Sequence, residues 1–179
     1  MHITVSPLLA DLALDSTGYR LLLLGHLLCV IVGFGSTFVY PFLGNHASKV
    51  KGKEGAAISD ATIGTARIVT TPFIYGAFAF GLALVGFGPY GFDYVFVQIA
   101  ATLLFGALLF SHFVHVANLE KMNELANELA AMGPPPAGAA GPPPQAVELE
   151  KRGKDAARNG GILHLAFAVV LVLMVWKPR

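Results

Sequence analysis

Five residues of this sequence have types and positions that could carry chemistry. His112 and His115 stand where an apolar run gives way to a charged one, and His164 stands near the start of a later apolar run. Imidazoles from two facing helices can ligate the iron of haem b at both axial positions, or form part of a metal site. The spacing therefore predicts a cofactor site formed by His164 and one of the two earlier histidines.

Arg67 and His26 complete this set of candidate binding residues. Arg67 flanks the same end of the apolar runs as His112 and His164, and its guanidinium can hold a propionate or another anion. His26 lies near the opposite end of the first run, with no second histidine at that level, so the residues alone favour a polar interior role for it. The alternative for every histidine is a hydrogen bond to a carbonyl, a water or a headgroup.

The composition indicates a membrane protein. Of the 179 residues, 55% are hydrophobic and only 13% are charged, and the mean hydropathy is +0.64. An apolar run of about 20 residues is long enough to cross a bilayer as a helix. We therefore expect an all-α, four-helix integral membrane bundle that forms a single domain over residues 1–179, with the lipid bilayer around it. The expected spans cover residues 21–43, 68–87, 94–116 and 160–177.

Residues 117–159 predict a helical hairpin between spans three and four. Residues at alternating steps of three and four continue from span three into the charged segment, so we expect one helix over 94–132 with both histidines on its packed side. The proline-rich segment 133–144 should form the tip of the hairpin. The expected seam consists of Gln98, Ala101, Phe105, Leu108, His112, His115, Leu119, Met122, Ala126 and Leu129.

Span one carries a stripe of polar and small residues on one helical face. Such a face has no reason to meet lipid, so it should pack against another helix. In span two, Pro72 follows two threonines and predicts a kink. Ser6 and Pro7 predict a short surface helix ahead of span one. The stripe consists of Tyr19, Leu22, His26, Cys29, Gly33, Ser36 and Tyr40.

The basic residues predict the orientation. The connections between spans one and two and between spans three and four hold nine Lys and Arg residues, and the opposite side holds three. Short loops rich in Lys and Arg are retained on the cytoplasmic side of a membrane. Both connections should therefore be cytoplasmic and both termini outside, in a bacterial inner membrane. The net charge of +1 and the lack of a basic arm argue against nucleic acid as a partner.

Several short motifs resemble known membrane families. They are "VYPFLGNHA", "RIVTTPFIYGAFAFG" and "VLMVWKP", together with His26 early in span one. The chain resembles a bacterial family of predicted integral membrane proteins of unknown function and, more distantly, the HemJ-type protoporphyrinogen oxidases and copper-resistance D proteins. The resemblance implies that His26 corresponds to the oxidase's first-span histidine, which is associated with haem or porphyrin chemistry. Gln98 and Phe42 stand where the oxidases carry a lysine and an arginine.

Three functional hypotheses follow. The first is a protein that binds haem or a porphyrin for electron transfer or haem handling. The second is a non-enzymatic accessory subunit of a larger membrane complex, respiratory or otherwise redox-active. The third is a copper- or solute-handling protein, for which only Met122 and Met132 offer soft ligands near the same end. No catalytic motif or acidic pair appears inside the spans, so the residues assign no reaction.

Overall fold

The structure, a computed structural model, describes residues 16–133 and 141–178. These residues are almost entirely helical and contain no strand. Four helical segments are long and apolar enough to cross a membrane, so the protein is a multi-pass membrane protein with an all-α, four-helix fold. The expected surface helix at Ser6 and Pro7 and most of the proline-rich tip lie outside the described residues.

The first two spans are joined by a pair of shorter helices. Helix α1 (Thr17–Thr37) is capped by the Ser16 hydroxyl, which accepts a hydrogen bond from the Tyr19 amide at 3.2 Å. Two residues separate it from α2 (Tyr40–Val50), which has Pro41 in its first turn, so this proline bends the chain and does not end the helical path. After a tight turn, α3 (Gly52–Thr65) leads through a π-helical turn (Ala66–Thr70) into α4 (Thr71–Phe87).

The second half of the chain forms two long helical segments. Helix α5 (Val95–Phe110) continues through a π-helical turn (Ser111–Val116) into α6 (Ala117–Met132), which confirms one helical path from span three into the hairpin. Helix α7 (Pro144–Trp176) then runs without interruption through the returning arm of the hairpin and span four.

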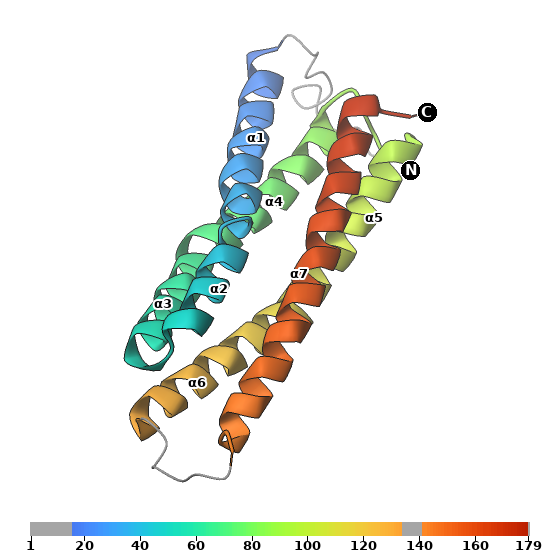
Figure 1. The fold of residues 1–179 in the computed structure, drawn as a ribbon. Coiled ribbons are helices and arrows are strands. Elements are labelled where there is room, and N and C mark those ends of the chain that lie inside the picture. Colours follow the sequence, from blue (N-terminus) through green and yellow to red (C-terminus); the bar gives the residue numbers. More distant parts are fainter. Residues whose placement is uncertain (1–15, 134–140, 179) are drawn as a thin grey trace, which may run out of the picture.

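The spans pack as two helix pairs, α1 against α4 and α5 against α7 (Figure 1). The α2–α3 pair and α6 lie together at one end of the molecule, beside the first half of α7, and α3 packs against α6. We call this the hairpin end. The first residues of α1 and the last of α7 lie at the opposite end, so both basic connections share one side of the molecule as expected.

The segment between spans one and two, expected only as a connection, is a helical hairpin of its own. Lys51 and Gly52 both have positive φ, which turns the chain sharply between α2 and α3. A Cβ atom on Gly55 would lie 2.6 Å from the carbonyl oxygen of Ala47, so the two helices approach more closely than a side chain would permit. The bundle therefore has a second hairpin that packs on the predicted one.

The predicted seam is packed in the hairpin and only partly packed inside the membrane, where Ala101 and Leu108 are half-buried and Phe105 stacks on Phe78 of α4. Within α5 the buried residues are Phe96, Val97 and Ala100, whereas Gln98 and Phe105 are exposed. In a π-helical turn hydrogen bonds span five residues, so one extra residue rotates the following helix by about 100°. The turn at Ser111–Val116 therefore joins two different packed faces, which a constant helical period cannot predict. In α6 the seam residues Leu119, Met122, Ala126 and Leu129 are partly buried beside Leu125, which is 5% exposed.

Candidate functional site

The polar stripe of span one faces α4, as predicted. None of its seven residues is fully exposed, and Gly33 is buried. A Cβ atom on Gly33 would lie 2.9 Å from the Ile74 backbone nitrogen, and one on Gly76 would lie 2.9 Å from the Cys29 sulfur. Small residues on both helices thus bring the two backbones together and enclose the polar groups between them.

His26 lies in this contact and is fixed by a backbone carbonyl. Its Nδ1 is 2.8 Å from the carbonyl oxygen of Ala77 in α4. A carbonyl can only accept, so Nδ1 carries the hydrogen, and in the neutral ring Nε2 holds the lone pair. No described residue hydrogen bonds to Nε2. Ligating histidines are commonly oriented in this way, with one ring nitrogen donating to a carbonyl and the other left for the metal.

Three hydroxyl groups form a chain of hydrogen bonds at the hairpin end of the same contact. Ser36 donates to the Gly33 carbonyl oxygen at 2.8 Å, so it must accept from the Thr70 hydroxyl, which lies 2.7 Å away. Thr70 therefore accepts from the Tyr40 hydroxyl. Thr70 is only 5% exposed, and the π-helical turn before Pro72 carries it. Hydrogen-bond donation thus runs from Tyr40 through Thr70 and Ser36 to the Gly33 carbonyl. This series of bonds joins α1 and α2 to the start of α4.

His164 on α7 is held by α1. Its Nε2 lies 2.9 Å from the Thr37 hydroxyl, and its ring is tilted against Phe38 with the centroids 4.5 Å apart. Thr37 donates its own hydrogen to the Phe34 carbonyl oxygen at 2.7 Å. It can therefore only accept from His164, so Nε2 carries the hydrogen and the lone pair of the neutral ring is on Nδ1.

The two histidines of the π-helical turn have different surroundings. His115 is partly buried against α7, where a Cβ atom on Gly160, one helical turn before His164, would lie 3.8 Å from its Cε1. Its Nδ1 is buried and has no hydrogen-bond partner in the described part of the chain. His112 is exposed, and its Nδ1 lies 3.4 Å from the Tyr75 hydroxyl. His112 does not pair with His164 as predicted: it lies on the α4 side of the turn, where it lines a small pocket with Tyr75 and Ile74.

Among the described residues, Arg67 forms no hydrogen bond with any of these histidines. Its guanidinium lies 2.5 Å from a carboxylate oxygen of Glu120 on α6, and both side chains are substantially exposed. Exposed ion pairs contribute about 0–1 kcal/mol, so this pair joins the two hairpins weakly. In the described residues no group of three or more His, Cys, Asp and Glu side chains has the geometry to hold a metal ion.

A second link between the hairpins centres on Asp60 of α3. Its carboxylate accepts hydrogen bonds from the amides of Asn123 and Asn127 on α6, at 2.8 and 3.1 Å. These two bonds favour the charged form and hold the pKa of Asp60 below its ordinary value. The sequence did not single out these residues, because their pairing depends on α3 being a helix that packs on α6.

Comparison with known proteins adds no relative: no family model, curated protein or solved structure matches the chain. Of the predicted site residues, the structure places His115 against the turn of α7 that precedes His164, and places His26, His112 and Arg67 elsewhere. Thr37 and Thr70, which order the polar groups, were not predicted. The signal available for Thr37 was its residue type, because a threonine hydroxyl inside a helix commonly donates to the backbone carbonyl three or four residues earlier.

Proposed function

We propose that this membrane protein binds haem or a porphyrin at His26, on the α1–α4 contact. The observation that carries the proposal is the hydrogen bond from Nδ1 to the Ala77 carbonyl oxygen, which leaves the Nε2 lone pair for a metal. A bound haem would supply an iron that accepts and releases one electron. The chain would hold it through His26 and exclude water with the apolar surface of α1 and α4.

His115 and His164, the histidines near the hairpin end of the spans, support a cofactor site less well than His26 does. His115 and His164 lie on facing helices, but the Nε2 of His164 donates to Thr37 and lacks a lone pair in this arrangement. Ligation through that atom would require Thr37 to release it. His112 is exposed and lies on the side of Tyr75, so it is not paired with His164. The bond to Thr37 favours an interior hydrogen-bonding role for His164.

Haem titration of the purified protein tests the proposal. The full-length chain, produced without added haem, should develop a Soret band that saturates at one haem per chain. The Soret band of the His26→Ala variant should not saturate. The His112→Ala variant should bind haem like the wild type, because His112 lies beside Tyr75 and away from His26. Equal haem uptake by all three proteins would refute His26 as the ligand.

An accessory subunit of a larger membrane complex is the second candidate. Its support is the hairpin end, where α2, α3, α6 and the first half of α7 form a helical layer beyond the spans. The Asp60 and Arg67 contacts join the two hairpins into one unit that could present a surface to a partner. Co-purification of the same membrane proteins with the wild type but not with a chain lacking residues 118–158 would support this function.

A further inference from the structure

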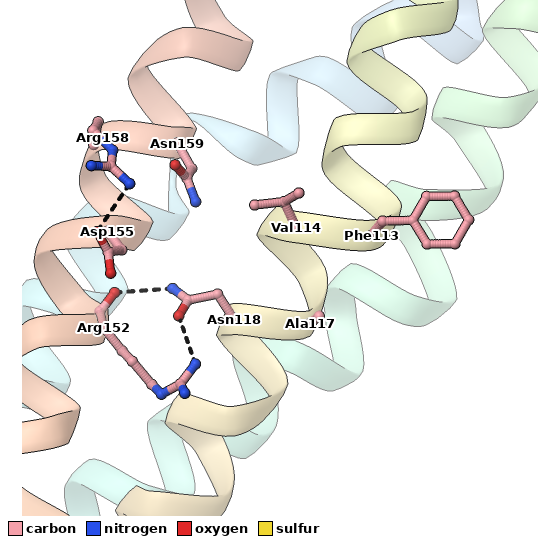
Figure 2. A pocket seen from close by; sticks show the side chains of 8 residues that line it. All are labelled: Phe113, Val114, Ala117, Asn118, Arg152, Asp155, Arg158 and Asn159. Atoms are coloured by element: carbon pink, nitrogen blue, oxygen red, sulfur yellow. Dashed lines mark hydrogen bonds and ion pairs between the residues drawn. The ribbon is translucent and has the colours of Figure 1, made fainter.

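A polar cleft lies between the hairpin arms where they meet the membrane (Figure 2). It has a volume of about 330 Å³, at the lower end of the range for small-molecule sites. One wall comes from the π-helical turn and the start of α6, and the other comes from α7. The cleft is lined by Phe113, Val114, Ala117, Asn118, Arg152, Asp155, Arg158 and Asn159.

The lining changes from apolar to charged along the membrane normal. Phe113 and Val114, at the end of span three, are 69% and 44% exposed, and Val114 points toward the cleft. Arg152, Asp155 and Arg158 lie on the part of α7 that precedes span four. The cleft therefore sits at the level where lipid headgroups meet acyl chains.

Asn159 is the residue that points to a ligand. It is only 4% exposed and it lines the cleft, and no described residue hydrogen bonds to its side-chain amide, whose atoms are accessible only from the cleft side. A buried amide without a partner costs free energy, so such groups normally bind a protein group, a water or a ligand. Here both the donor and the acceptor of the amide remain for a molecule in the cleft.

The two guanidinium groups are positioned by neighbours but keep free donors. Arg158 forms an ion pair with Asp155 at 3.1 Å, and its side chain is otherwise 69% exposed. Arg152 forms an ion pair with Glu148 at 2.7 Å through Nε and donates to the Asn118 side-chain oxygen at 3.2 Å, while its backbone carbonyl accepts from the Asn118 amide at 3.0 Å. A guanidinium has five N–H donors, so each arginine can also bind an anion.

We propose that this cleft binds the phosphate of a membrane phospholipid. Arg158 and Arg152 would bind the phosphate oxygens, and Asn159 would hydrogen bond to the headgroup. Val114, which points toward the cleft, would contact the first carbons of the acyl chains. The site is independent of His26, because its lining residues come only from the π-helical turn, α6 and α7.

Native mass spectrometry of the full-length protein, titrated with phosphatidylglycerol, tests this site. Arg158→Gln should weaken the tightest phosphatidylglycerol binding about tenfold, because it removes a charge-assisted hydrogen bond. Lys154→Gln is the matched control: it removes the same charge from α7, but Lys154 pairs with Glu150 and does not line the cleft. It should change binding less than twofold. Equal effects of the two substitutions would overturn the proposal.

Two further measurements separate a lipid from a free anion and a ligand from water. Val114→Ser should weaken phosphatidylglycerol binding, and inorganic phosphate should bind far more weakly than the lipid. Phosphate that binds as tightly as the lipid would contradict a lipid site. Asn159→Leu should also weaken lipid binding in a chain whose thermal unfolding shows that it is folded. Unchanged affinity in that folded variant would mean that water fills the cleft.

Discussion

Thr37 and His164 lie 2.9 Å apart, between α1 and α7, and the direction of their hydrogen bond is determined. Thr37 gives its only hydrogen to the Phe34 carbonyl, so His164 must be the donor. Together with the stacked rings of Phe34 and Phe167, whose centroids are 4.1 Å apart, this bond joins the two helix pairs of the membrane domain. The inner histidine thus has a structural role that requires no ligand.

Thr37→Val tests that role. The substitution keeps the shape of the side chain and removes the acceptor, so it should lower the free energy of unfolding by about 0.5–2 kcal/mol, the range for hydrogen bonds between membrane helices. Denaturant unfolding in detergent measures it. Thr65→Val is the control, because the Thr65 hydroxyl bonds only within its own helix, to Ala61. Indistinguishable unfolding of the two variants would contradict a stabilising contact.

Helices α1 and α4 lie so close together at Gly33 that any side chain at this position would clash with α4. A methyl group there would lie 2.9 Å from the Ile74 nitrogen and 3.1 Å from the Phe73 carbonyl carbon, both backbone atoms that cannot move aside. We expect Gly33→Ala to destabilise the protein by about 1–3 kcal/mol. Gly35→Ala should be neutral or stabilising, because nothing lies within 4 Å of that position. The reverse order of stability would mean that α1 and α4 are not packed in this way.

Asp60 predicts acid sensitivity of the contact between the hairpins. Its pKa is lowered in the folded protein by the amides of Asn123 and Asn127, so its contribution to stability is complete above the ordinary value of 3.8. It is lost as the pH falls below that value and through the folded pKa. Proteolysis of α3 and α6 between pH 5 and 3 should therefore accelerate in the wild type. The Asp60→Asn variant should be cleaved faster than the wild type at pH 5, and its rate of proteolysis should change less between pH 5 and 3.

The orientation remains a prediction from charge. Both hairpins lie at one end of the molecule, and the excess of Lys and Arg there predicts a cytoplasmic location. A reporter fused after Gly138 should give a cytoplasmic signal, and one fused after Arg179 should give an external signal. The opposite pair of signals would reverse the orientation, and two signals from one side would contradict four spans.

The sequence predicted the spans and the face of span one because both depend on regular patterns. Six of the seven stripe residues, from Tyr19 to Ser36, share a face of α1, and that face does pack, while Tyr40 begins α2. The neighbour of His112 could not be predicted in this way, because a periodic pattern shows which face of a helix packs but not which helix it meets, and His112 lies beside Tyr75 of α4. The tautomers of His26 and His164 also needed the structure, since each depends on an acceptor distant in sequence.

Optical difference spectra of wild-type, His26→Ala and His164→Ala proteins test the central claim most directly. The proteins are purified after expression with ample haem, and reduced and oxidised forms are compared. We predict b-type bands for the wild type and His164→Ala, and loss of the bands in His26→Ala with recovery when imidazole is added as an external ligand. Bands that survive in His26→Ala but disappear in His164→Ala would contradict the His26 site, and a colourless wild type would contradict haem binding.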